Sequence, residues 1–175
     1  MVLRPFTHDD LKELHAIRSL PEVARYVPWE PDGDLEATAK ALEARMGQTA
    51  LTEEKQPLTV AVELAATGEL IGDAMLFWVS EQHRCGEVGY VFHPGHHGRG
   101  YATETVLALL ELGFDGMDLR RIIGRLDARN DASARVLERA GMRREAHLVE
   151  NELFKGEWTD ELVYAILQRE WRARR

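Results

Sequence analysis

The sequence contains a single cysteine, Cys85, in 175 residues. One cysteine excludes an internal disulfide framework and any zinc site built from several cysteines, and we expect Cys85 to be a small buried residue beside a strand. Positive charge is also scarce, because 22 Lys and Arg stand against 30 Asp and Glu, for a net charge of −8. This balance disfavours nucleic acid as a general partner and suits a cationic acceptor such as an amine.

The chain also lacks a long apolar run. No stretch approaches the roughly 20 residues that a membrane helix needs, and the N-terminus has no basic-then-apolar signal. We therefore expect no membrane contact and a cytoplasmic location. Hydrophobic residues make up 45% and charged residues 30% of the chain, as in globular proteins, and the length predicts one domain, residues 1–175.

Local patterns predict strands and helices that alternate along the chain. The expected strands are 2–6, 57–65, 69–79, 86–93, 121–127, 142–149 and 160–168, and the expected helices are 7–18, 34–46, 100–114 and 130–141. The Thr67-Gly68 turn between the second and third strands is typical of an antiparallel hairpin. Together these elements predict the α/β class, a mixed sheet with helices on both faces.

The most informative stretch is residues 87–104, EVGYVFHPGHHGRGYATE. A short apolar strand ends near Phe92, a glycine-rich loop covers residues 94–100, and a long amphipathic helix follows. A helix N-terminus presents unpaired N–H groups and a partial positive charge, and Gly98 and Gly100 allow positive φ and close approach to a ligand. This arrangement predicts a site for a phosphorylated cofactor.

Two common phosphate-binding loops do not fit this stretch. A Walker A loop ends in Gly-Lys-Ser/Thr, and the chain has no such tripeptide. A dinucleotide fingerprint needs Gly or Ala where Thr103 stands, although Asp118 lies where a ribose-binding acid is expected. That fingerprint should also follow the first strand of a βαβ series, whereas several expected strands precede this loop.

The loop instead resembles the Q/R-x-x-G-x-G/A pyrophosphate loop of the GCN5-related N-acetyltransferases (GNAT). His97 stands at the Gln/Arg position, Gly100 at the first glycine and Ala102 at the final small residue. Residues 98–104, GRGYATE, and 130–142, NDASARVLERAGM, are similar to the RimJ/RimL-type branch, which acetylates ribosomal-protein N-termini. Leu3-Arg4-Pro5 and residues 160–164 also look like this branch, so the resemblance runs nearly end to end.

The resemblance implies an acetyl-CoA-dependent N-acetyltransferase that needs no metal, with a mostly antiparallel sheet and direct acetyl transfer in a ternary complex. The implied acceptor is a primary amine, either a protein N-terminus or a small molecule, and the protein is expected to be a monomer or a homodimer. A non-catalytic acyl-CoA-binding sensor with the same fold is the alternative. The expected cofactor-binding residues are Val91, Phe92, His93, His97, Gly98, Arg99, Gly100, Tyr101, Ala102, Thr103, Asn130 and Ser133.

The chemistry of acetyl transfer needs a base near the amine. An alkyl amine with a pKa of about 10.4 is almost wholly protonated at neutral pH. Glu87 is the candidate base, because strand alternation places it on the same face as Gly89 and Val91. In the family, backbone N–H groups of this splayed strand polarise the thioester carbonyl, which corresponds here to Val91 and Phe92. Alternatively, Glu87 is a solvated residue at a strand edge.

The leaving thiolate needs a proton donor. Many acetyltransferases of this superfamily carry a tyrosine in the helix after Asn130, near Leu137, and this chain does not. Ser133, in the first turn of that helix, is therefore the candidate acid. Alternatively, its hydroxyl makes a cap-region hydrogen bond to the backbone, and Asn130 acts only as the helix cap.

The sequence predicts the acceptor site less well than the cofactor site. Trp29 lies between the first two helices, in a segment that borders the acceptor cleft in relatives, and Trp78 ends the strand before Glu87. We expect both to bind substrate, with a packed loop anchor and a core position as the respective alternatives. The clustered His93, His96 and His97 sit on a Pro-Gly loop, a poor frame for zinc, so we expect them to face the cofactor phosphates.

Overall fold

The computed structural model describes residues 1–174. Its strands are β1 (Val2–Arg4), β2 (Pro57–Glu63), β3 (Leu70–Ser80), β4 (Cys85–Phe92), β5 (Arg121–Asp127), β6 (Arg143–Phe154) and β7 (Glu157–Leu167). Its α-helices are α1 (Leu11–Arg18), α2 (Pro21–Ala24), α3 (Leu35–Met46), α4 (Tyr101–Glu111), α5 (Asp131–Arg139) and α6 (Gln168–Arg172). Two short 3-10 turns, His8–Asp10 and Pro94–His96, and a π-helical turn, Leu112–Gly116, complete the list.

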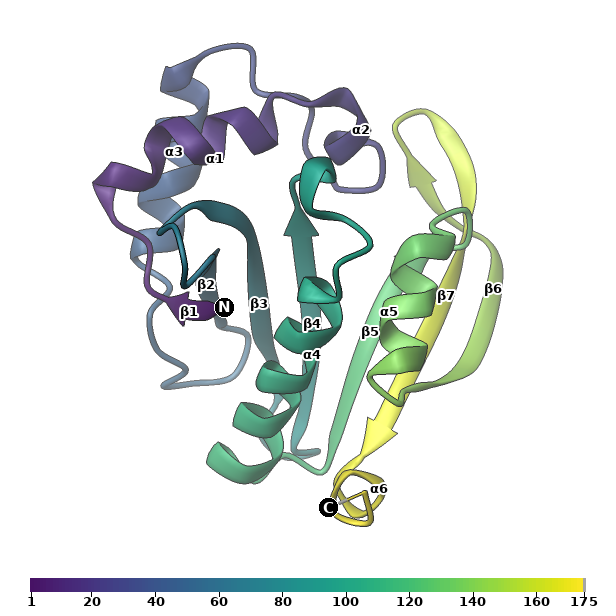
Figure 1. The fold of residues 1–175 in the computed structure, drawn as a ribbon. Helices are drawn as coiled ribbons and strands as arrows, with labels where there is room; N and C mark the ends of the chain where they lie inside the picture. The colour runs from purple at the N-terminus through teal and green to yellow at the C-terminus, as the bar shows by residue number, and fades with distance from the viewer. Residues whose placement is uncertain (175) are drawn as a thin grey trace.

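The strands form one sheet in the order β1-β2-β3-β4-β5-β7-β6. Every neighbouring pair is antiparallel except β4 and β5, which are parallel. The expected α/β fold, a mixed and mostly antiparallel sheet with helices on both faces, is therefore confirmed. Figure 1 shows β4 and β5 at the middle of the sheet, diverging from each other toward the end at which α2 lies.

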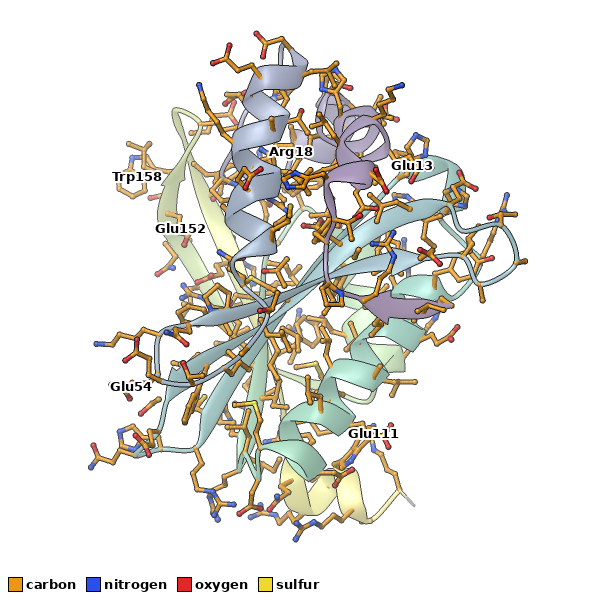
Figure 2. The ribbon with its side chains drawn as sticks, turned by 90° about the vertical axis from the view of Figure 1, so that its left-hand side faces the viewer. Glu13, Arg18, Glu54, Glu111, Glu152 and Trp158 are labelled. Atoms are coloured by element: carbon orange, nitrogen blue, oxygen red, sulfur yellow. The ribbon has the colours of Figure 1, made fainter. Side chains whose placement is uncertain are left out.

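The two faces of the sheet carry separate helices and separate apolar cores. On one face, α4 and α5 pack against β4 and β5 through residues such as Val88, Val106, Leu110 and Leu137. On the other face, α1 and α3 cover β2 and β3 through a smaller cluster that includes Leu14 and Leu42. Figure 2 shows α3 and α4 on opposite sides of the sheet, with Glu111 marking the far end of α4.

Several expected boundaries are wrong. The last two strands extend over 143–154 and 157–167, so the turn between them is only Lys155-Gly156. The added strand residues, such as Glu150, are exposed and polar, and the hydrophobic pattern therefore did not indicate them. The short helix α2 was not expected either. It begins at Pro21, and a proline is tolerated at the first helical position. Helix α6 was not expected. Among residues 1–174, no helix is long and apolar enough to cross a membrane.

Candidate functional site

The glycine-rich loop ends in a helix start whose backbone donors are free. Gly98 and Gly100 have φ of +76° and +86°, and the first bond of α4 runs from the Glu104 N–H to the Gly100 carbonyl at 3.0 Å. Within the described chain, the N–H groups of residues 98–103 have no hydrogen-bond partner. A Cβ at Gly98 or Gly100 would meet nothing within 4 Å, so both face open space. Consecutive free amides at a helix N-terminus are suited to phosphate oxygens.

The side chains at this helix start anchor the backbone. Tyr101 and Ala102 pack against the main apolar core, while Arg99 is exposed at the tip of the loop. The loop therefore offers its amides from a fixed position, with the exposed Arg99 side chain beside them. Because this arrangement depends on backbone donors, the sequence pattern of glycines and small residues was enough to find it.

The three histidines of the loop contact other groups of the protein through their ring nitrogens. His97 Nε2 donates to the Phe92 carbonyl at 3.2 Å, which requires the proton on Nε2 because a carbonyl only accepts. His93 Nδ1 accepts from the Gly95 N–H at 3.1 Å, and His96 Nε2 lies 3.1 Å from Glu69 Oε1. No group of three or more His, Cys, Asp or Glu side chains within residues 1–174 is arranged to hold a metal ion.

Replacing His97 should have a small but measurable effect. His97→Ala removes the bond to Phe92 and should weaken CoA binding roughly two- to tenfold, the usual net value of one hydrogen bond. His97→Gln, which restores an amide donor, should recover part of this loss. Calorimetric titration with CoA measures both, and an alanine variant as tight as the parent would show that the Phe92 contact does not shape the loop.

Beside the loop, β4 and β5 separate. They pair only over residues 85–87 and 121–123. The His93 N–H bonds to the Ile71 carbonyl of β3 at 2.9 Å. Since N–H groups alternate in direction along a strand, the Val91 amide also points toward β3, and those of Tyr90 and Phe92 point into the gap. Of the two expected backbone donors, Phe92 therefore faces the gap and Val91 does not.

Glu87 lies at the point where the two strands separate. It pairs with Phe77 of β3 and Ile123 of β5 and shares its strand face with Val91, which packs against the α1 and α3 cluster. Its carboxylate has no hydrogen bond or ion pair with any described residue. Burial raises the pKa of Glu87, and the positive charge of Arg125 offsets only part of this effect. A carboxylate with a raised pKa is a stronger base near neutral pH.

The surroundings of Glu87 are acidic on the β5–β7 side. Arg125 makes two bonds of 2.7 and 2.8 Å to the buried carboxylate of Glu161, and Glu152 of β6 lies 3.7 Å from Arg125. Glu161 also accepts from the Asn151 side chain at 2.8 Å. Glu152 and Glu161 both act to raise the pKa of Glu87. The guanidinium of Arg125 is therefore surrounded by the carboxylates of Glu87, Glu152 and Glu161.

Ser133 lies on the opposite side of the sheet, at the start of α5. Asn130 caps this helix, because its Oδ1 accepts from the Ser133 N–H at 3.1 Å. The Ser133 hydroxyl has no bond to any described residue, so it is not used in the helix cap. The Ser133 carbonyl accepts from the Tyr90 hydroxyl at 3.1 Å.

Tyr90 is a residue that the sequence reasoning missed. It lies on β4 beyond the point of separation and spans from that strand to α5. Burial raises the pKa of its phenol well above the usual value, so the hydroxyl remains a donor at all ordinary pH values. The available signal was strand alternation, which turns Tyr90 away from the face of Glu87 and toward α5.

The two tryptophans occupy different places. The Trp29 ring stacks 4.0 Å from the guanidinium of Arg18, which forms a buried pair with Asp32 at 2.7 Å. Trp78 pairs with Gly86 and packs against the main core on the α4 face. The structure therefore places Trp78 and Glu87 on opposite faces and does not bring them together.

The separated strands, the free amides of the loop and the unpaired carboxylate of Glu87 are suited to an acyl-group transferase with a phosphorylated donor. A family model for the acetyltransferase (GNAT) domain matches residues 1–143. The chain is 35% identical over 173 residues to an uncharacterised N-acetyltransferase of Bacillus subtilis, YnaD, covering 98% of this chain and 95% of that protein. The protein thus belongs to the GNAT family of N-acetyltransferases, enzymes that use an acyl-CoA.

Solved structures agree with this assignment. The crystal structure of a GNAT-family acetyltransferase from Bacillus anthracis superposes with a TM-score of 0.86 at 32% identity, over 96% of this chain and 95% of that one. A spermidine N-acetyltransferase from Vibrio cholerae, in complex with CoA and spermine, has the same fold, with a TM-score of 0.80 at 24% identity over 98% of this chain and 97% of that one.

Proposed function

We propose that this protein transfers the acetyl group of acetyl-CoA directly to a primary amine within a ternary complex. The observation that carries the proposal is the run of free amides at residues 98–103 beside the gap between β4 and β5. In this proposal residues 97–103 and Asn130 hold the donor, with the pyrophosphate on the amides. The Phe92 N–H stabilises the oxyanion that forms on the thioester carbonyl.

The roles of the remaining residues follow from the two sides of the gap. Glu87 receives a proton from the ammonium group, directly or through water, and the neutral nitrogen then attacks the carbonyl carbon. A C–N bond forms, the C–S bond breaks, and the thiolate takes the proton of the Ser133 hydroxyl. The nitrogen, which carries an extra proton after the attack, gives it through water to the Ser133 oxygen, and Glu87 releases its proton to solvent. Glu87 and Ser133 lie on opposite faces, so donor and acceptor approach the gap from different sides.

Direct transfer is also supported by the environment of the single cysteine. Cys85 is half-buried, and this burial raises the pKa of its thiol, which makes it a poor nucleophile near neutral pH. An acyl-cysteine intermediate is therefore disfavoured. Initial rates measured over a matrix of acetyl-CoA and amine concentrations test this point. Intersecting reciprocal plots are expected for a ternary complex, and parallel plots would contradict it.

Of the two acceptor classes, we propose a small-molecule amine. Three carboxylates, Glu87, Glu152 and Glu161, lie around the guanidinium of Arg125. Among the relatives is a spermidine N(1)-acetyltransferase of Vibrio cholerae, 24% identical over 98% of this chain and 95% of that protein. A panel of alkylamines, polyamines and peptides with free N-termini tests the choice. Preference for the peptides would favour the RimJ/RimL-type activity that the motifs at 98–104 and 130–142 resemble.

Removing the Ser133 hydroxyl should slow the chemical step. Ser133→Ala should lower kcat on the order of 10- to 100-fold, as for loss of a general acid, with nearly unchanged CoA affinity. Ser133→Thr retains a hydroxyl and should keep more activity. Steady-state kinetics with CoA calorimetry separate the two effects, and full activity in the alanine variant would mean that water protonates the sulfur.

A further inference from the structure

The open end of the gap is bridged by residues 24–30, which we call the bridging segment. The carboxyl ends of the parallel strands β4 and β5 point the same way, and their pairing stops at Glu87 and Ile123. The gap therefore opens toward the carboxyl ends of both strands. Tyr26 ties the segment to the turn after β5, since its hydroxyl lies 3.3 Å from the Arg129 carbonyl. Figure 1 shows α2, where the segment begins, between α1 and the β6–β7 hairpin.

A second tie comes from the turn of that hairpin. Lys155 Nζ donates to the carbonyls of Ala24 and Trp29, each at 2.9 Å, and lies 3.4 Å from a carboxylate oxygen of Glu30. An ammonium group has three donors and no acceptor, so the two carbonyls satisfy two of its donors and Glu30 adds an ion pair. The Lys155 side chain is only 27% exposed. Its ammonium therefore occupies a built cation site that joins the first and last parts of the segment to the hairpin.

The backbone at Lys155 points to a role for its side chain. Lys155 has φ of +50° and Gly156 φ of +84°, so both turn residues are left-handed. Two-residue hairpin turns of this type strongly favour Asn, Asp or Gly at the first position. A lysine is strained in this backbone conformation. Its hydrogen bonds to the bridging segment offset that strain.

We propose that Lys155 is a specificity-determining residue, which holds the bridging segment across the mouth of the gap and so sets the affinity for the amine acceptor. It acts as a positioning residue through Ala24 and Trp29 and leaves donor binding and the chemical step unaffected. The kinetic part rests on the proposed function, because it needs an acceptor that is acetylated. The ordering of the bridging segment by Lys155 does not depend on that function.

The kinetic test compares three variants with the acceptor that the panel identifies. Lys155→Met should raise the acceptor KM on the order of tenfold, the equivalent of about 1.4 kcal/mol, with little change in kcat or in the acetyl-CoA KM. Lys155→Arg, which keeps a cation with several donors, should recover most of the affinity. Lys40→Met is the matched control, because Lys40 is exposed and its ion pair among the described residues is with Glu36 on α3. An unchanged acceptor KM in Lys155→Met, or a change shared with kcat and the acetyl-CoA KM, would overturn the proposal.

A second test uses hydrogen exchange and needs no activity. The amides of the bridging segment, including the Val27 N–H that bonds to the Ala24 carbonyl at 3.3 Å, should exchange faster in Lys155→Ala and be unaffected in Lys40→Met. Added n-propylammonium, which restores the missing part of the side chain, should slow the exchange again. Unchanged exchange in Lys155→Ala would overturn the proposal that Lys155 orders the bridging segment, whatever the kinetics show. If the wild-type protein acetylates no amine, the proposed function fails, and the exchange result still shows whether Lys155 orders the bridging segment.

Discussion

Gly100→Val should abolish CoA binding at concentrations where the wild-type protein is saturated. Gly100 has φ of +86° and stands immediately before α4. A β-branched residue is strained there, and its Cβ would enter the open space that faces the free amides. Both effects act on the same backbone donors, so we expect a loss of two orders of magnitude or more in affinity, on the order of 3 kcal/mol. Calorimetry with CoA alone measures it without any acceptor.

The control for this variant must carry the same backbone strain elsewhere. Gly156 has φ of +84° and, like Gly100, has nothing within 4 Å of its Cβ position. Gly156→Val should therefore lose a similar amount of stability in thermal unfolding and bind CoA normally. If the two variants bind CoA equally well, residues 98–103 are not the pyrophosphate site.

Glu87→Gln should cause the largest loss of turnover, on the order of 10² to 10⁴ as for removal of a general base. The glutamine keeps the size of the side chain but cannot take a proton. The deficit in kcat/KM should be greatest at low pH and should shrink as the pH rises, because neutral amine then forms unaided. Profiles of the same shape and height would exclude Glu87 as the base. A deficit that is equal at every pH would instead indicate that Glu87 orients the substrate cation.

The same variant has a stability signature with a defined sign. Burial raises the pKa of Glu87 in the folded state, so folding favours its protonated form. This preference is fully present below the usual carboxyl pKa of about 4.3 and is lost as the pH rises through the folded pKa. Glutamine resembles the protonated form at every pH. Glu87→Gln should therefore unfold at a higher temperature than the parent at pH 7 to 8, and at a similar temperature near pH 4.

Features that depend on local backbone chemistry could be predicted from the sequence. Asn130 caps α5, Gly141 is left-handed at its end with φ of +88°, and Asp34 caps α3 through the Ala37 N–H. The conformation of the glycine-rich loop belongs to the same group, because Gly98 and Gly100 are left-handed directly before an amphipathic helix. In each case, residues close in sequence determine the structure.

Features that depend on contacts between distant segments could not be predicted. Tyr90 reaches Ser133 and Lys155 reaches Ala24 across long stretches of chain. Strand alternation gives the face of Tyr90 but not its partner, and no local pattern marks the Lys155 contact. Trp78 is turned to the α4 face by the register of β3 on β4, which sequence alone does not fix. Leu107 of α4 is apolar but 37% exposed, because the buried residues of that helix include Val106, Leu109 and Leu110 on another side.

The most direct test of the account follows the thiol and the amine together. Purified protein is mixed with acetyl-CoA and each amine of the panel, and both free CoA thiol and the mass of the amine are measured. We expect thiol release that depends on the amine, with one acetyl group gained by the amine for each thiol formed, and release slower on the order of 10² to 10⁴ in Glu87→Gln at neutral pH. Binding of CoA without amine-dependent release would contradict the account and indicate an acyl-CoA sensor.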